Sequence, residues 1–487
     1  KTKIHDKFSV EFKIGFIVRR SQEDNDFILN TWIFVPNSLD INPSTYDKTD
    51  FYRDLKSNVR LITPIFLLRD ITGGDAKPYN FLKSSFENVA SNPLRTTISD
   101  YIYQIKMFCA ILKSSLRNES ELIIRTSNLS DKVSLCNNFL ENVNDILAKY
   151  KNLWRIINVP IIKENDKNHY SFGDEYICHI ASYYTLKVLK NIEKQTQTED
   201  IKTIRESFIE LTNSINAHRA SKGYFVAKEG DADNNSNMIQ RHSFLKKYVE
   251  SDLFVKLDKK PDGVPVQQIY FSLAAGIAMI FATVIAFYFQ KTYGNYSMPL
   301  FVALVVSYML KDRIKDLMRY YFAHKLKGRF FDNKASIHIK DDKVGWIKEG
   351  VDFITDDKTP PEVLELRNRS SLLQVENEIF DEKILLYRMK AYINNKDLAS
   401  HYQYRISGLN DIIRLYINNF TLKMDNPEIS LETLSQSDEV ISLNTRKIYN
   451  INIVMQLKVE DTIAYKGFRV VISRDGILDI LELDKIK

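Results

Sequence analysis

The sequence predicts an α+β membrane protein, and three observations carry that prediction. Apolar and polar residues alternate near both ends of the chain, which is typical of β-strands. Between residues 93 and 262 the apolar residues recur with the helical period. Two long uncharged stretches follow, at 263–290 and 292–310. We therefore divide the chain into an N-terminal β-rich unit, a helical bundle, a two-helix transmembrane hairpin, a basic amphipathic stem and a C-terminal antiparallel β domain (sandwich or barrel), over residues 1–92, 93–262, 263–310, 311–331 and 332–487.

The composition is that of a folded chain with sizeable water-soluble domains. Of 487 residues, 44% are hydrophobic and 27% are charged, and the formal net charge is +6. This balance excludes a disordered protein, and a mean hydropathy of −0.27 excludes a polytopic transporter. The cysteines Cys109, Cys136 and Cys178 are too scattered for a disulfide framework. We expect them to be free, buried and in a reducing compartment.

The first unit is predicted to be a small sheet. Phe8–Val18 alternates as a half-buried strand does, and the polar segment Arg19–Asp26 leads into a second apolar run, Phe27–Val35. We expect these two runs to pair as a hairpin, with Arg60–Leu68 as a third strand. Lys1–Phe16 lacks the continuous apolar region of a signal peptide.

The second unit is predicted to be an antiparallel helical bundle, because its segments have helical length and a single apolar face. Helices are expected over about 98–112, 130–154, 172–193, 201–218 and 239–255. Ser130 is the expected N-cap of the second helix. The polar segment 227–238 is expected to be an exposed loop.

The two uncharged stretches predict a helical membrane hairpin. Ile269–Phe289 is 21 residues long and apolar except for Ser272 and Thr283. At about 1.5 Å per residue it reaches roughly 30 Å, the thickness of the hydrocarbon core. The second stretch is apolar over Met298–Leu310, with Pro299 in its first turn. A buried core helix is the alternative for each stretch.

Small residues recur at helical spacing in both stretches, and such residues allow close packing of helices in lipid. We expect this face to serve either the partner helix of the hairpin or a second protomer. The predicted packing residues are Ala274, Ala278, Ala282, Ala286, Ala303 and Ser307.

The basic stem predicts the orientation of the hairpin. Residues 311–329 hold seven Lys or Arg and two Asp, a net charge of 7 − 2 = +5, and the turn between the helices offers Lys291 alone. The positive-inside rule then places both flanking domains in the cytoplasm, with a bacterial inner membrane as the expected location. The apolar residues of the stem form one helical face: Ile314, Leu317, Met318, Tyr321, Phe322 and Leu326.

The cations of the stem are candidate contacts for anionic lipid headgroups. The alternative is that they only fix the topology and solvate the helix; nucleic-acid binding is not favoured, because no recognition fold accompanies them. The candidate lipid contacts are Lys311, Arg313, Lys315, Arg319, Lys325, Lys327 and Arg329.

The C-terminal region predicts antiparallel β-structure, since it lacks helices long enough for parallel crossovers. Asp475-Gly476 marks a hairpin between the last two strands. The expected strands are Ile337–Ile339, Val344–Ile354, Ile384–Ile393, Ile412–Leu422, Ile448–Val459, Phe468–Ile472 and Ile477–Leu483.

The sequence contains no familiar catalytic motif. The sequence has no phosphate-binding glycine loop, no H-E-x-x-H, no C-x-x-C and no G-x-S-x-G. Asp231-x-Asp233-x-Asn235 resembles the start of a calcium loop, but Ser236 and His242 replace the required Gly and Glu. Glu175 and His179 share a helix face without a third ligand nearby in sequence. We therefore assign no catalytic, cofactor-binding or metal-ligating residue.

Three classes of function fit these observations. The first is a membrane-anchored cytoplasmic sensor, scaffold or adaptor without evident catalysis, which binds a protein or a small ligand. The second is an oligomeric pore, channel or membrane-permeabilising effector gated by its cytoplasmic domains. The third is a membrane-tethered enzyme with an unrecognised site. We expect the lipid bilayer as a partner and a homo-oligomer as the assembly.

Overall fold

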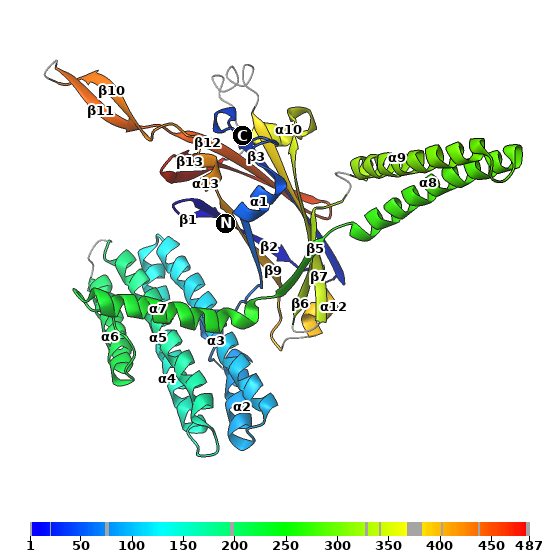
Figure 1. Cartoon of the computed structure of the whole chain (residues 1–487). Coiled ribbons are helices and arrows are strands. Elements are labelled where there is room, and N and C mark those ends of the chain that lie inside the picture. The colour runs from blue at the N-terminus through cyan, green and yellow to red at the C-terminus, as the bar shows by residue number, and fades with distance from the viewer. Residues whose placement is uncertain are drawn as a thin grey trace. The chain divides into compact units, whose positions relative to one another are not determined.

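The computed structural model describes residues 2–19, 21–73, 77–194, 199–326, 330–339, 342–367, 382–400, 403–436 and 439–483. The chain divides into two compact units. The β unit comprises Lys1–Val59, Lys256–His401 and Gly408–Lys487. The helical unit comprises Arg60–Val255 and Tyr402–Ser407. The predicted mixture of terminal sheets and a helical middle is confirmed at this level (Figure 1).

An eight-stranded sheet, antiparallel at each pairing whose register is described, is the larger part of the β unit. β3 (Asp24–Val35) lies inside it and pairs along its length with β8 (Lys383–Asn394) and over Phe27–Phe34 with β12 (Tyr449–Val459). The remaining strands are β13 (Thr462–Ser473) and β14 (Gly476–Leu483) on one side, and β7 (Asp342–Ile354), β6 (Asn333–Ile339) and β5 (Lys256–Pro261) on the other.

A four-stranded sheet completes the β unit, in the order β1 (Thr2–Asp6), β2 (Ser9–Ile17), β9 (Gly408–Tyr416) and β4 (Leu55–Leu61). The predicted hairpin between β2 and β3 is wrong, because these strands belong to different sheets. Asn25 accepts a hydrogen bond from the Arg19 amide at 2.8 Å, and the chain changes sheets here. Both strands pair instead with strands from beyond residue 380, so the two predicted β regions form one unit.

The core of the β unit lies on both faces of β3, because successive strand residues point to opposite faces. Thr31 and Ile33 line a small cavity together with Phe12 and Ile413 of the four-stranded sheet. Trp32 and Phe34 pack on the other face with Val363 and Leu366 of α10 (Pro361–Leu366). Burial on both faces explains why the apolar run Phe27–Val35 is nearly continuous.

Three local features of the β unit depart from the expected strands. β9 ends at Tyr416 and is followed by α13 (Asn418–Thr421), where a longer strand was expected. The ribbon of β10 (Glu428–Leu434) and β11 (Val440–Arg446) was not predicted. β4 covers Leu55–Leu61, whereas the expected strand was Arg60–Leu68. The strand cannot continue to Leu68 within a sheet, because Pro64 lacks the amide hydrogen that a sheet requires. The predicted Asp475-Gly476 hairpin is confirmed between β13 and β14.

The helical unit consists of α2 to α7, with buried aromatic side chains at its centre, among them Tyr101, Phe108, Phe139, Tyr150 and Phe208. The predicted helices are confirmed, although Asn128 rather than Ser130 is the N-cap of α4. α2 was not predicted, and Asp231 caps α7, so the expected loop ends there. The bounds are α2 (Lys77–Ser91), α3 (Arg95–Arg125), α4 (Leu129–Ile157), α5 (Glu164–Ile192), α6 (Glu199–Ser221) and α7 (Ala232–Glu250).

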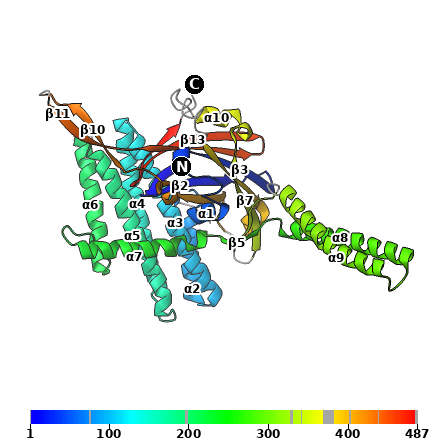
Figure 2. The same ribbon diagram turned by 45° about the horizontal axis from the view of Figure 1, so that its top comes forward.

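Two long helices interrupt the β unit between β5 and β6. They are α8 (Val264–Tyr293) and α9 (Met298–Leu326), and they run side by side as an antiparallel pair, visible in both orientations (Figure 1, Figure 2). α9 continues without a break from its apolar first half into the basic stem. Pro299 lies in its first turn, as predicted. The described residues also form the short helices α1 (Lys48–Asp54) and α12 (Asn395–Ser400).

Candidate functional site

Small residues lie between α8 and α9. Ala274 and Ala278 are the buried residues of α8, and Ala303 and Ser307 are buried on α9. The Ser307 hydroxyl donates a hydrogen bond to the Ala282 carbonyl at 3.2 Å. Small side chains allow this approach of two backbones. The remaining predicted packing residue, Ala286, is half-buried.

The outer surface of the α8–α9 pair is apolar and exposed. Ile280 is 65% exposed, Phe287 66% and Phe301 61%, and many neighbouring aliphatic side chains share this exposure. Soluble monomers rarely expose a contiguous apolar patch of more than a few hundred Å². A surface of this kind is typical of a contact with lipid or with another protein.

One helix of the described chain, α8, is long and apolar enough to cross a membrane by length and composition. α9 is long enough, but too many of its residues are charged for it to qualify in the same way. Its apolar stretch ends at Leu310, and Lys311, Asp312 and Arg313 follow at once. The predicted hairpin of two membrane-spanning helices is therefore confirmed only in part: both helices form and pack together, but only α8 is long and apolar enough to span a membrane.

The register between the two helices places the basic part of α9 beside the first half of α8. The rings of Tyr270 and Phe322 are 5.1 Å apart, and the Arg319 guanidinium lies 5.6 Å from the Phe271 ring centre. The apolar tip that both helices share therefore begins near Ala278 and Leu310. About 15 residues of α8 lie beyond that level, or roughly 22 Å of helix. The shared tip is shorter than a hydrocarbon core of about 30 Å.

Only some of the predicted lipid-contacting cations have described side chains on α9. Lys311, Lys315 and Arg319 share one stripe at i, i+4 and i+8, and Lys315 pairs with Asp312 at 3.1 Å. Arg313 is exposed. The Lys325 side chain, Lys327 and Arg329 lie outside the described residues, as does the Leu326 side chain. Within the predicted apolar face, Ile314, Met318 and Phe322 are half-buried, whereas Leu317 and Tyr321 are exposed.

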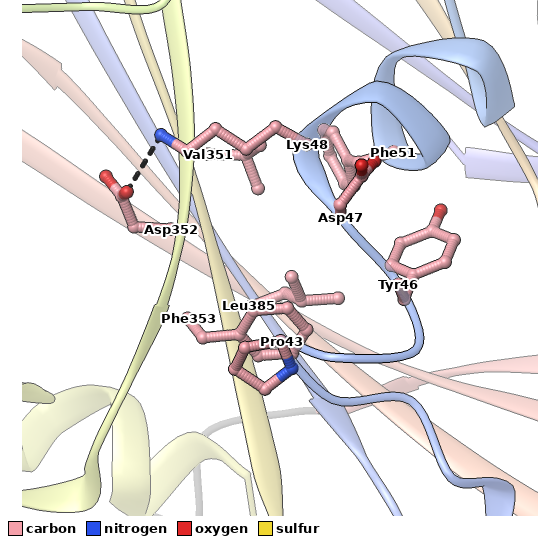
Figure 3. Close-up of a pocket in the computed structure, with 9 residues that line it drawn as sticks. All are labelled: Pro43, Tyr46, Asp47, Lys48, Phe51, Val351, Asp352, Phe353 and Leu385. Carbon is pink, nitrogen blue, oxygen red and sulfur yellow. Dashed lines mark ion pairs between the residues drawn. The ribbon is translucent and has the colours of Figure 1, made fainter.

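A pocket of about 330 Å³ lies in the β unit, between the start of α1 and the strands β7 and β8 (Figure 3). Its walls are mostly apolar, from Pro43, Tyr46, Phe51, Val351, Phe353 and Leu385. Asp47 caps α1 by accepting from the Asp50 amide at 2.9 Å, which fixes Lys48 at the first helical position. Lys48 then reaches across the pocket to Asp352, as the dashed line shows (Figure 3).

Lys48 is the centre of a charged network at the rim of this pocket. Its ammonium lies 2.7 Å from Asp332 and 2.9 Å from Asp352. Burial lowers the pKa of Lys48, but the bonds to these two carboxylates outweigh burial and raise the pKa above its ordinary value. Asp332 also accepts from the Tyr52 hydroxyl at 3.0 Å and from the Val351 amide at 2.8 Å. Lys48 is therefore a fixed cation with an apolar cavity beside it.

Asp332 connects this pocket to the base of the α8–α9 pair. Its carbonyl accepts from the Asp262 amide at 3.2 Å, which joins the segments before α8 and after α9. Gly263, with φ of 76°, begins α8 and packs against the Phe330 ring so closely that a Cβ would collide with it. Asp332 therefore contributes its side chain to the rim of the pocket and its backbone carbonyl to the base of the helix pair.

The polar residues singled out from the sequence in the helical unit have structural partners. Arg241 donates to Glu175 with distances of 2.8, 3.0 and 3.2 Å. His179 stacks on His242 with ring centres 3.6 Å apart. Burial, followed by the neighbouring His242, lowers the pKa of His179 to about 3, so it is neutral near pH 7. Glu175 and His179 therefore do not form a site together.

The comparisons with known proteins give no relative. No protein-family model, no curated protein and no solved structure matches this chain significantly. The geometry alone therefore indicates the class of protein. That geometry consists of an exposed apolar helix pair, a cationic stripe and a pocket joined to the base of the pair.

Proposed function

We propose that this chain is a membrane-anchored cytoplasmic sensor or adaptor. The observation that carries the proposal is the helix pair, whose inner face holds small residues and whose outer face is apolar and exposed. A lipid bilayer is the environment that accepts such a surface, because lipid tails are as apolar as Leu or Ile. The α8–α9 pair inserts in the membrane, with the β unit and the helical unit on the cytoplasmic side.

The charges support this orientation. The basic residues lie at the base of the helix pair and Lys291 alone lies near its tip, in agreement with the positive-inside rule. Tyr293 and Tyr296 at the tip suit the far headgroup layer. Because the shared apolar tip is only about 22 Å long, Lys311 and Lys315 extend toward the near headgroups, and the bilayer thins locally.

The pocket supplies the sensing half of the proposal. Its apolar walls and the single ammonium of Lys48 fit a small ligand with an apolar body and one acidic group. The acidic group competes with Asp332 and Asp352 for Lys48, and the lost bond to Asp332 changes the base of the helix pair. The membrane segment and the pocket are thereby coupled without any catalytic step.

Neutralising the cationic stripe tests the membrane half. The triple variant Lys311→Gln, Lys315→Gln, Arg319→Gln is expected to lose affinity for anionic vesicles on the order of 100-fold, at about 1 kcal/mol per charge. Binding to zwitterionic vesicles is expected to stay unchanged. The measurement is vesicle flotation of the purified full chain at increasing fractions of phosphatidylglycerol.

The matched control removes three exposed lysines of the helical unit, by Lys163→Gln, Lys190→Gln and Lys247→Gln. This control has the same net charge as the test variant. If both variants lost the same affinity for anionic vesicles, net charge alone would account for the loss, and a role for the stripe would be contradicted.

A pore is the second candidate, and the helix register favours it. If α8 crosses the bilayer completely, Lys311, Lys315 and Asp312 of α9 lie at hydrocarbon depth beside it. Charged residues at that depth face a protein interior or a water-filled path. Several copies arranged with these stripes inward would line such a path.

The mass of the assembly in nanodiscs separates the two candidates. A monomer or dimer is expected for the anchored sensor, since two helices per chain cannot enclose a conduit in so few copies. A ring of four or more chains would favour the pore and would be followed by conductance measurements.

A further inference from the structure

Three side chains with metal-binding atoms meet in the helical unit. Asp174 and Cys178 lie one turn apart on α5, and His218 lies near the end of α6. One oxygen, one sulfur and one nitrogen from these residues all lie within 4.8 Å of one another. Asp174 is 2% exposed, and the Cys178 and His218 side chains are also largely covered. Asp174 and Cys178 are therefore buried, and His218 is the member of the cluster that reaches the surface.

We propose that Asp174, Cys178 and His218 bind a zinc ion. A thiolate, an imidazole and a carboxylate are the ligand types that Zn²⁺ takes in proteins, at about 2.3 Å to sulfur and 2.0–2.2 Å to nitrogen or oxygen. Tetrahedral bonds of these lengths separate the ligand atoms by roughly 3.5 Å. The observed spacing reaches that value with side-chain shifts of about 1 Å. Two anionic ligands balance the charge of the ion.

Two of these ligands already face each other across the two helices. The Tyr224 hydroxyl, which donates to the Ser171 carbonyl at 3.3 Å, lies near the Asp174 carboxylate. The His218 Nε2 atom lies 2.9 Å from the Asp174 Oδ2 atom, so the imidazole already faces the carboxylate. This hydrogen bond explains the pair of Asp174 and His218. It does not explain why a thiol completes the group, whereas a zinc site does.

The site has three protein ligands among the described residues. Three ligands leave a fourth tetrahedral position to water, which is the arrangement of zinc sites that interact with small molecules. Glu175 and His179, each one residue further along α5, point elsewhere and bind Arg241 and His242. The two neighbouring i, i+4 pairs on α5 therefore differ in function: one holds α7, and the other faces α6.

Cobalt is the probe for this site, because Co²⁺ substitutes for Zn²⁺ and a bound thiolate produces charge-transfer absorption in the near ultraviolet. The full chain, purified in detergent and stripped with chelator, is titrated with Co²⁺. We expect one Co²⁺ per chain with thiolate charge transfer, and displacement by Zn²⁺. The Cys178→Ser variant is expected to lose the charge-transfer band, and His218→Gln to bind at least tenfold more weakly.

Cys136→Ser is the matched control, because Cys136 is also buried on a long helix of the same unit but belongs to no such cluster within the described part of the chain. It is expected to keep both the band and the affinity. A band that survives Cys178→Ser, or a titration without binding, would overturn the proposal and leave the hydrogen bond between His218 and Asp174 as the whole interaction.

A measurement on the unmodified chain covers the case in which a variant does not fold. The X-ray absorption spectrum of the zinc-loaded protein is expected to show one sulfur ligand together with nitrogen and oxygen ligands. A spectrum with nitrogen and oxygen alone would exclude Cys178 and contradict the proposal.

Discussion

Replacing Ile280 and Val284 with Asp is expected to release the chain from membranes. Both side chains lie on the outer face of α8 and are 65% and 60% exposed. An Asp near the middle of a membrane helix costs about 2.5–3.5 kcal/mol, so two cost roughly 6 kcal/mol. Partitioning into vesicles should therefore fall by about 10⁴-fold. Flotation of the full chain with vesicles measures this change.

The control places the same two charges on an exposed surface of the helical unit, by Tyr183→Asp and Leu186→Asp. These side chains are 57% and 46% exposed, so the substitutions add the same charge without touching α8. The control is expected to float with the vesicles. Undiminished flotation of the α8 variant would show that this helix does not contact lipid.

The stability of the β unit is expected to fall as pH rises from about 4 to 7, because of Asp411 on β9. Its side chain is 0% exposed, and only one of its oxygens has a hydrogen-bond partner in the described structure, the Ser57 hydroxyl at 2.7 Å. Burial raises the pKa of Asp411 to about 7. Between about pH 4 and pH 7 the folded state therefore binds a proton that the unfolded state has released.

Because the folded state binds more protons in this range, the free energy of unfolding decreases from about pH 4 to pH 7, by on the order of 4 kcal/mol. The Asp411→Asn variant lacks the charge and is expected to be more stable than the unchanged chain at pH 8. Denaturant midpoints in mild detergent at pH 5 and pH 8 measure both effects.

Asp357→Asn is the control for this prediction, since Asp357 is an exposed carboxylate of the same unit. It is expected to leave the pH dependence unchanged. A pH dependence that persists in Asp411→Asn would assign the titration to another group.

The sequence predicts the local structure of this chain well where one segment determines it. The uncharged run Gly263–Gln290 and the stripe of small residues beginning at Ala274 lie within single helices, so periodicity identifies them. Asp475-Gly476 is likewise a short-range signal, and the structure contains its hairpin. The predicted start of a helix is wrong where a capping side chain sets it, as Asn128 does for α4 and Asp231 for α7.

Features built from distant segments could not be predicted in this way. β2 and β3 adjoin in sequence but lie in different sheets, because each pairs with a strand from the C-terminal region. The pocket joins Lys48 to Asp332 and Asp352 across nearly 300 residues, and no motif marks any of the three. His218 reaches Asp174 only once α5 and α6 have packed.

The depth of α8 in a bilayer shows directly whether the helix pair inserts among the lipids. An environment-sensitive fluorophore is attached at Ile280→Cys in the full chain, and at Lys190→Cys as the reference, in vesicles with lipid-borne or aqueous quenchers. The native cysteines are buried and do not compete for the label. We predict that lipid-borne quenchers act on the label at position 280 and that aqueous iodide does not. Iodide quenching at 280 equal to that at 190 would contradict insertion of the helix pair.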